Sequence, residues 1–268
     1  MPIILTVVVI CKDNPEELKR TLLSIYSCDL EADRHNELEV LVIDSSGDIK
    51  CKNVWMGLAG DWPNARYEWT PPRGIYAAKK VGLLSAQGMF VQFLNSGDIY
   101  ASESAIADCL RAVTGSPNDC RLIYFDTYEL HPDDELRLCP TRNPQDIVKQ
   151  SLESLQHPYW NDFPRTASCL FRRSALTIEI GGLHIAEDHR FILSLIAASN
   201  GEDCLHIPSC LSVYEIGGYS WQSPIEVAFE WCCIQKMFYR GSPKDLHVLF
   251  IDFLMGSLRG FIDDQNIV

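Results

Sequence analysis

The chain has 268 residues, of which 47% are hydrophobic, and a formal net charge of −13 at pH 7. This size suits one large globular domain or a domain with an appendage. The negative charge makes nucleic-acid backbones and anionic membrane surfaces poor partners of the protein as a whole. Eleven cysteines, an odd number without a Cys-x-x-Cys pair, predict reduced thiols in an intracellular protein. No apolar run reaches the roughly 18 residues of a membrane span.

Strands alternate with helices in the first hundred residues. The β-branched run Ile3–Ile10 predicts a strand buried on both faces, and Pro15 begins a helix with apolar residues at helical spacing up to Tyr26. By contrast, Cys51–Ala65 has little periodicity and predicts no regular element. The other expected elements here are a strand at Leu38–Ile43, an edge strand at Tyr67–Trp69, a helix within Pro71–Gly88 that ends at Gly88, and a strand from Gly88 to Leu94.

The second half continues with the same alternation and ends in apolar helices. The expected elements are a helix at Ser102–Val113, a hairpin of Leu122–Leu130 with Glu135–Cys139, an irregular or partly helical flap at Thr141–Phe163, a strand at Ala167–Phe171, a helix from Glu187 to Ala198 and a strand at Cys204–Tyr214. Two further helical stretches, Ile225–Tyr239 and Leu246–Phe261, are too apolar to stand free in water. We expect them to pack on the domain, to dimerise or to contact a membrane surface, in that order.

Polar residues follow the strands where the carboxyl ends of a parallel sheet should lie. A strand–helix–strand unit crosses over in the right-handed sense, so the loops after the first two strands should meet. Asp44 there is either a nucleoside ligand or an Asx-turn residue. Asp98 is either a ligand for a divalent metal or the cap of the following helix. Arg73, at a helix start, either binds a phosphate or is solvated.

Several motifs in fixed order support a more specific hypothesis. They are Asp13–Pro15, Val42–Asp48, Gly74–Tyr76, Phe93–Asp98, Leu170–Ser174, Gly181–Gly182, Ala186–Asp188 and Gly217–Ser220. Their order and spacing, over about residues 3 to 220, resemble the family 2 glycosyltransferases of the GT-A fold. The resemblance is greatest to the bacterial enzymes that build capsule, exopolysaccharide or O-antigen.

The resemblance implies an α/β fold with a Rossmann-like, mixed but mostly parallel sheet flanked by helices. Residues 1–220 would form the GT-A domain, with a nucleotide-sugar half at 1–100 and an acceptor half at 101–220. Residues 221–268 would be a C-terminal helical extension, the part expected to contact a membrane or form a homodimer. The family also implies a location in the cytoplasm or at the inner face of its membrane.

The implied activity is inverting transfer of a sugar, commonly from a UDP-sugar, to a glycan or lipid-linked acceptor. Asp98 would bind Mn²⁺ or Mg²⁺, and Asp188 would be the catalytic general base. The residues expected to bind the donor and its metal are Asp13, Asp44, Ser45, Arg73, Asn95, Ser96 and Asp98. Enzymatic function then requires that Asp98 and Asp188 meet in one cleft.

The sequence departs from the family pattern at the helix after Gly74–Tyr76. Ala77 replaces an aspartate, and Lys80 or its neighbour replaces an asparagine. The alternative hypothesis is therefore a catalytically degenerate GT-A domain that binds a nucleotide-sugar or serves in assembly. A nucleotidyltransferase is disfavoured, because Lys12–Pro15 lacks the glycines of a phosphate-binding loop.

Overall fold

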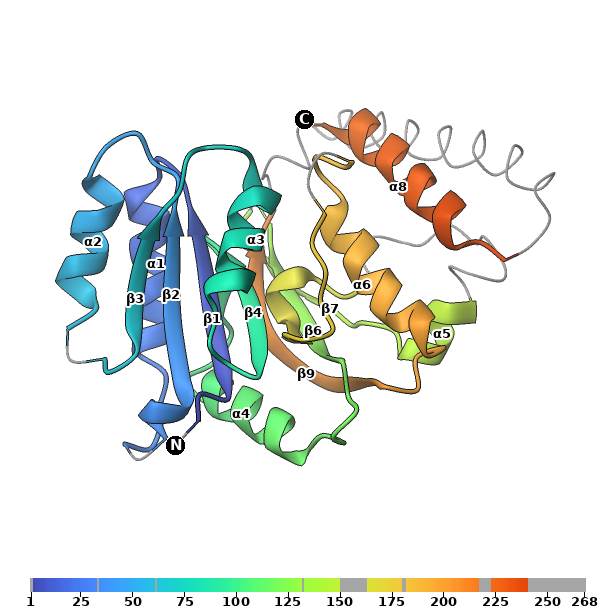
Figure 1. Ribbon diagram of the computed structural model, residues 1–268, viewed down its shortest axis with the longest axis horizontal. Coiled ribbons are helices and arrows are strands. Elements are labelled where there is room, and N and C mark those ends of the chain that lie inside the picture. The colour runs from blue at the N-terminus through green and yellow to red at the C-terminus, as the bar shows by residue number, and fades with distance from the viewer. Residues whose placement is uncertain are drawn as a thin grey trace.

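The computed structural model describes residues 2–32, 34–60, 62–131, 133–149, 163–179, 182–216 and 223–240. Most of the expected flap at Thr141–Phe163 lies outside these residues, as do Gly217–Ser220 and the second apolar stretch, Leu246–Phe261. Figure 1 shows the described elements as one layered α/β assembly, with helices on both faces of a central sheet. The expected α/β architecture is confirmed.

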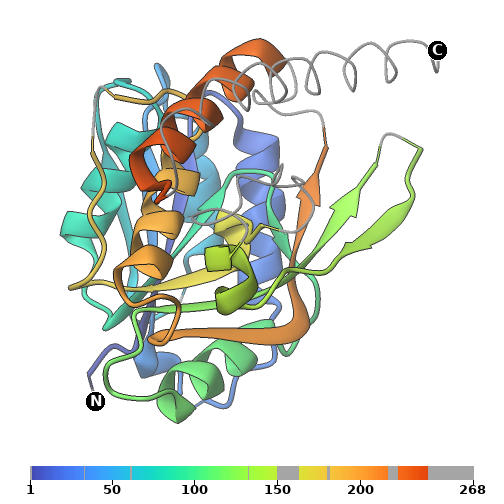
Figure 2. The same ribbon diagram turned by 90° about the vertical axis from the view of Figure 1, so that its right-hand side faces the viewer.

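Within the described residues, one nine-stranded sheet has the order β3-β2-β1-β4-β8-β6-β9-β5, and β7 pairs with β6. Its parallel half consists of β1 (Leu5–Cys11), β2 (Leu38–Asp44), β3 (Ala65–Trp69) and β4 (Phe90–Asn95). The mixed half consists of β5 (Ile99–Tyr100), β6 (Leu122–Leu130), β7 (Leu136–Cys139), β8 (Cys169–Arg172) and β9 (Cys204–Glu215). Figure 2 shows the β6–β7 hairpin projecting from the body, in agreement with the predicted hairpin.

The β1 strand is buried on both faces, because helices cover the sheet on either side. Successive side chains of a strand point in opposite directions. Thus Val7 and Val9 join the core cluster that contains helix α1 (Pro15–Tyr26), whereas Val8 and Ile10 join the cluster that contains helix α3 (Ile75–Ser85). This two-sided burial explains why the β1 sequence is a nearly continuous apolar run, without alternation of polar and apolar residues.

The other α-helices of the described residues complete the two layers. They are α2 (Lys50–Leu58), α4 (Ala105–Gly115), α5 (Pro144–Val148), α6 (Glu187–Ala198) and α8 (Pro224–Phe238). Helix α8 packs with α6, and its Val227, Trp231 and Ile234 side chains are buried in the same cluster as α3. The first apolar C-terminal stretch therefore packs on the domain, as the preferred alternative predicted.

Helix α2 corrects the expectation of an irregular segment after Cys51. Only Cys51 is buried in this helix, and Met56 is 61% exposed. Val54, Trp55 and Leu58 are partly buried and pack on the same core cluster as Cys51, so the helix has an apolar stripe at helical spacing that the sequence analysis overlooked. The two-residue strand β5 was also not predicted, since two residues carry no period.

Gly88 corrects a second expectation. Helix α3 ends at Ser85, before Gly88, and Gly88 instead lets the chain pass close to β1. Its N–H donates to the Thr6 hydroxyl (2.8 Å). A Cβ atom here would lie 2.6 Å from the Thr6 nitrogen and 2.8 Å from the Phe90 oxygen, both of them backbone atoms. Glycine is therefore required by a close approach of two backbones.

We expect Gly88→Ala to lower the free energy of unfolding by about 1–3 kcal/mol or more, because the backbone of β1 must move. Urea unfolding measures this change. Gly57→Ala is the control: nothing lies within 4 Å of its added Cβ. In helix α2 this substitution should be stabilising by up to about 1 kcal/mol. Equal stability of Gly88→Ala and the wild type would contradict the close approach.

Candidate active site

The loops after β1, β2 and β4 are joined by hydrogen bonds at the carboxyl edge of the sheet. The Asp13 N–H donates to the Ser46 hydroxyl (2.8 Å), and the Gly47 N–H donates to Asp13 Oδ1 (2.9 Å). Asn14 Nδ2 donates to the Ser96 hydroxyl (2.5 Å). Three of the expected donor-site loops therefore form one edge, where ligands bind in open α/β sheets.

Asp44 is held inside this edge. Its Oδ1 accepts from the Ser46 N–H (2.7 Å), which is an Asx-turn contact, and its Oδ2 accepts from the Tyr67 hydroxyl (2.6 Å). Asp44 is fully buried, and the adjacent Ser45 is 7% exposed. Both carboxylate oxygens of Asp44 are therefore engaged within the protein.

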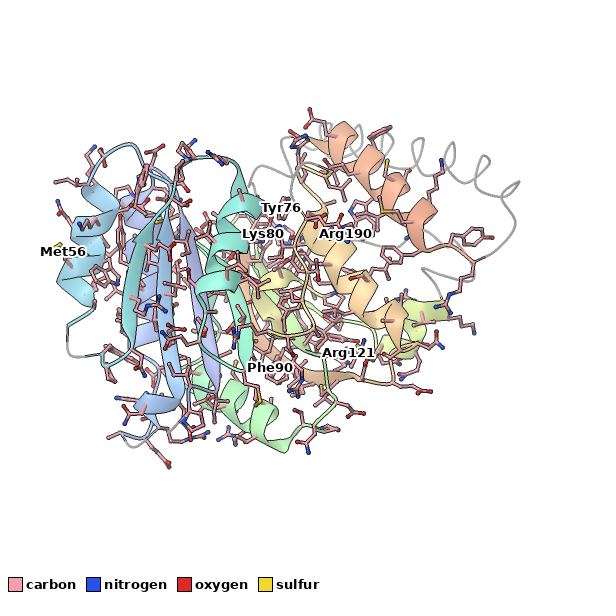
Figure 3. The ribbon with its side chains drawn as sticks, viewed as in Figure 1. Met56, Tyr76, Lys80, Phe90, Arg121 and Arg190 are labelled. Carbon is pink, nitrogen blue, oxygen red and sulfur yellow. The ribbon has the colours of Figure 1, made fainter. Side chains whose placement is uncertain are left out.

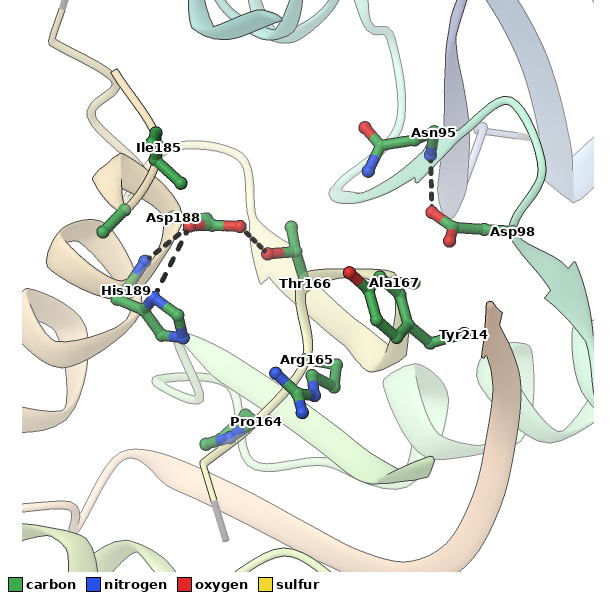
Figure 4. A pocket seen from close by; sticks show the side chains of 11 residues that line it. Asn95, Asp98, Pro164, Arg165, Thr166, Ala167, Ile185, Asp188, His189 and Tyr214 are labelled. Atoms are coloured by element: carbon green, nitrogen blue, oxygen red, sulfur yellow. Dashed lines mark hydrogen bonds and ion pairs between the residues drawn. The ribbon is translucent and has the colours of Figure 1, made fainter. Parts of the chain in front are cut away.

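Asp98 and Asp188 line the same pocket, although they come from opposite halves of the chain (Figure 4). Asp98 follows β4, and Asp188 lies in the first turn of α6. The other lining residues are Asn95, Pro164, Arg165, Thr166, Ala167, Ile185, Ala186, His189 and Tyr214. The structure therefore brings together the two carboxylates on which an enzymatic function depends.

Asp98 closes the turn that follows β4. Its Oδ2 accepts from the Asn95 N–H (2.7 Å), and its own N–H donates to the Asn95 oxygen (3.0 Å). Gly97 has a φ of 107°, which favours glycine at this turn. Helix α4 begins only at Ala105, with Ser104 as its N-cap residue, so Asp98 is not the cap of that helix. Burial raises the pKa of the Asp98 carboxyl to about 6, against the opposing effects of the Asn95 N–H and Lys79.

Asp188 accepts three hydrogen bonds. The donors are the Thr166 hydroxyl (2.8 Å), the Tyr76 hydroxyl (3.2 Å) and the N–H of His189 (3.0 Å). Burial by itself would raise the pKa of Asp188, but the positive charges of His189 and Lys79 and the hydrogen bonds outweigh it and lower this pKa. Burial in turn lowers the pKa of His189 to about 4 and also lowers the pKa of Lys79. The lowered pKa of Asp188 favours the ionised carboxylate, the form that a general base needs.

Tyr76 ties α3 to the start of α6. Its hydroxyl lies within hydrogen-bonding distance of both the Ile185 carbonyl and Asp188, and the two acceptors share its single proton. Figure 3 shows Tyr76 between the two helices. The resemblance singled out Tyr76 within Gly74–Tyr76, but its contact lies more than one hundred residues away and has no local sequence signal.

Glu230 of α8 supports the same turn from the other side. Its carboxylate accepts from the N–H groups of His184 (2.6 Å), Ile185 (2.8 Å) and Ala186 (2.7 Å). These N–H groups immediately precede and open α6, whose N-terminus attracts negative charge. Sequence reasoning missed Glu230, because it belongs to a stretch recognised only by its apolar face.

His189 is an internal residue and not a surface one. It is 9% exposed, and its ring centre lies 4.0 Å from that of Trp231 and 5.0 Å from that of Phe163. His189 is internal because α8 covers this side of α6. Helix α8 thus packs directly against the residue next to Asp188.

Of the four arginines near the expected motifs, only Arg165 lines the pocket. Arg165 pairs with Glu129 and lies 5.5 Å from the Tyr214 ring centre. Arg173 donates to the Gly88 carbonyl (2.9 Å), near the amino end of β4, where a diphosphate at the carboxyl edge would be out of reach. Its neighbour Arg172 likewise donates to a backbone carbonyl, that of Cys120. Arg73 is exposed ahead of α3 and does not line the pocket.

Two places in the described residues offer candidate metal ligands. Cys11, Asp44 and Cys51 form a buried cluster of soft thiols and one carboxylate, a set unlike the all-oxygen shells of Mg²⁺. In the pocket, the Asn95 side-chain oxygen is buried and has no hydrogen-bond partner among the described residues. Together with Asp98 it offers two oxygen donors, and such ligands suit Mn²⁺ and Mg²⁺. The pocket therefore fits a divalent metal.

Comparison with solved structures identifies proteins of the same fold. The chain is similar to S. aureus TarS 1–349 in complex with UDP-GlcNAc, with 15% identity and a TM-score of 0.64 over 94% of this chain and 72% of that one. It is also similar to the mannosyltransferase PcManGT from Pyrobaculum calidifontis in complex with GDP-Man and Mn²⁺, with 15% identity and a TM-score of 0.60 over 97% of this chain and 76% of that one.

These likenesses define a GT-A-like glycosyltransferase fold. No protein-family model and no curated protein matches the sequence. No helix in the described part of the chain is both long and apolar enough to span a bilayer.

We expect Glu230→Ala to lower the free energy of unfolding by about 2–3 kcal/mol, because three N–H groups lose a charged acceptor. Urea unfolding measures the loss. Glu226→Ala, an exposed change on the same helix, should have an effect below about 0.5 kcal/mol. If the two variants are equally stable, α8 does not hold the start of α6.

His189 makes stability dependent on pH. Its pKa is lowered from 6.5 to about 4 in the folded chain, so its contribution is present above pH 6.5 and is lost as the pH falls toward 4. Between pH 7 and pH 4 the wild type should lose about 2–3 kcal/mol more than His189→Leu. Urea unfolding at a series of pH values tests this. Other groups titrate in both proteins, so parallel curves would contradict the shift.

Proposed function

We propose that the protein transfers a sugar from a nucleotide-diphosphate sugar to a hydroxyl acceptor, with inversion at the anomeric carbon. The observation that carries the proposal is the pocket shared by two carboxylates, the buried Asp98 and the half-buried Asp188, on a GT-A-like fold. The solved neighbours bind UDP-GlcNAc, UDP, or GDP-Man with Mn²⁺. The donor would lie along the joined loops after β1, β2 and β4.

In this proposal Asp188 is the general base. It is ionised, and its hydrogen bonds with Thr166 and Tyr76 fix its orientation. An acceptor hydroxyl in the pocket would pass its proton to this carboxylate while its oxygen attacks the anomeric carbon. The bond from that carbon to the diphosphate oxygen breaks, and the nucleoside diphosphate leaves with the bonding electron pair.

Asp98 and Asn95 would hold Mn²⁺ or Mg²⁺ beside the diphosphate. When bound, such an ion neutralises the negative charge that develops on the leaving group. Of the other residues expected at the donor, Asp13 and Ser96 tie the three loops together, and Ser45 lies beside them. Arg73, exposed at the start of α3, would act only on a part of the donor outside the pocket.

The acceptor would enter from the side of the pocket formed by the second half of the chain. Arg165, Tyr214 and Pro164 line that side. We propose a glycan or a lipid-linked sugar as the acceptor class. Tyr214 offers an aromatic ring, and Arg165 donates hydrogen bonds from a guanidinium held by Glu129.

Asp188→Asn tests the chemistry. The variant should retain donor binding and lose about 10²–10⁴-fold in transfer, because an amide cannot accept the proton. The measurement is release of nucleoside diphosphate from a panel of UDP- and GDP-sugars, with calorimetry for donor binding. Asp119→Asn, an exposed carboxylate outside the pocket, is the matched control and should transfer at the wild-type rate.

Transfer by Asp188→Asn at the wild-type rate would remove Asp188 from the role of base. Nucleotide binding by the wild type without any turnover would instead favour the degenerate domain, for which Ala77 was the sequence signal. Absence of binding to any nucleotide would overturn the proposed function.

A further inference from the structure

Two thiols and a carboxylate meet inside the protein where β1, β2 and α2 come together. Cys11 is the last residue of β1, Asp44 is the last residue of β2, and Cys51 lies in the first turn of α2. One ligand atom from each of the three, a sulfur or a carboxylate oxygen, lies within 4.8 Å of the other two. The sheet fixes two of these residues relative to each other, because Cys11 is paired with Asp44 in the parallel register of β1 and β2.

The Asp44 carboxylate has no basic partner in the described part of the chain. It is fully buried, and its hydrogen bonds come from two neutral donors, the Ser46 N–H (2.7 Å) and the Tyr67 hydroxyl (2.6 Å). The neighbouring thiols of Cys11 and Cys51 are 2% and 0% exposed, so solvent does not screen this group either. Buried charges in proteins are paired or coordinate a metal ion. A cation bound between the three side chains would therefore supply the missing countercharge.

We propose that Cys11, Asp44 and Cys51 bind a thiophilic divalent ion, namely Zn²⁺. Two sulfur ligands and one carboxylate suit zinc, whereas Mg²⁺ and Mn²⁺ prefer oxygen ligands. With Zn–S bonds of about 2.3 Å and Zn–O bonds of about 2.0–2.2 Å, the ligand atoms of a tetrahedral site lie roughly 3.5–4 Å apart. Small side-chain rotations bring the three present atoms to that spacing. Both thiols lose their protons to solvent as the ion binds.

The surroundings already orient these ligands. Each oxygen of Asp44 accepts one hydrogen bond, and a carboxylate oxygen has a second lone pair for the ion. The Ser46 hydroxyl lies 3.3 Å from the Cys51 sulfur and can fill the fourth position of a tetrahedral shell. Hydrogen-bonded partners of this kind hold metal ligands in place and support the affinity of a site.

The ion would link three elements of the fold and not take part in chemistry. It would join the ends of β1 and β2 to α2, next to the loops that carry Asp13 and Ser46. It is also separate from the ion proposed at Asp98, because its ligands are mainly sulfur and the pocket offers only oxygen. The inference does not rest on the proposed function, and it gives Asp44 a role other than that of a nucleoside ligand.

Zinc content and coordination of the full chain test the inference. Because the ligands are buried, the protein is refolded from urea with Zn²⁺ and then dialysed against metal-free buffer. It should retain about one zinc ion per chain, and X-ray absorption at the zinc edge should show two sulfur ligands at about 2.3 Å, with oxygen as the other ligands. This readout requires no variant. Free Zn²⁺ at about 100 times its Kd should raise the unfolding midpoint by about 5 °C or more.

Cys51→Ala and Cys11→Ala each remove one ligand and should weaken zinc affinity by about 100-fold or more. Cys109→Ala is the matched control, since Cys109 is an equally buried thiol in α4, outside the cluster. It should retain zinc like the wild type. Urea unfolding without metal confirms that each variant is folded.

Three results would overturn the inference. They are a refolded wild type without zinc, bound zinc that does not have two sulfur ligands, and folded Cys51→Ala and Cys11→Ala that retain zinc as well as Cys109→Ala does. None of them affects the proposed function, which is measured by nucleotide binding and transfer.

Discussion

Keeping one half-buried carboxylate charged is the constraint on which this site depends. The Asp188 side chain is only 24% exposed, and burial without compensation would favour its protonated form. Four elements prevent that: Thr166 before β8, Tyr76 of α3, the first turn of α6 and the ammonium of Lys79. Residues from both halves of the chain therefore surround the Asp188 carboxylate. The packing of these elements also sets the charge state of Asp188.

The two carboxylates of the pocket differ because their surroundings differ. Asp98 has one hydrogen bond from the backbone, and burial raises its pKa to about 6. Asp188 accepts three hydrogen bonds, and its pKa falls. Two acids of the same type are thereby separated into one that is easily protonated and one that is not. Such a pair suits a site in which each carboxylate has its own task.

The sequence predicted the parts of the fold that have strong local signals. The apolar runs of β1, β2 and β4 were found because they are buried on both faces, and the loops after them were placed at one edge by the handedness of the crossover. Helix α2 was missed although Cys51, Val54, Trp55 and Leu58 form an apolar stripe, because only Cys51 of the four is fully buried and polar residues and an exposed Met56 lie between them. In the site, Asp98 and Asp188 were named from motif order. Glu230 and Lys79 were not, because their contacts depend on tertiary packing and not on spacing.

The contact of Glu230 with the start of α6 makes helix α8 a structural part of the domain. A chain cut after β9 would still contain every strand of the described sheet, and both carboxylates of the pocket. It would nevertheless leave three amide groups at the entrance to α6 facing solvent, and uncover His189. Residues beyond the apparent end of the domain thus belong to the folding unit. Truncation at that boundary would remove the Glu230 carboxylate, which holds the start of the helix that carries the proposed base, Asp188.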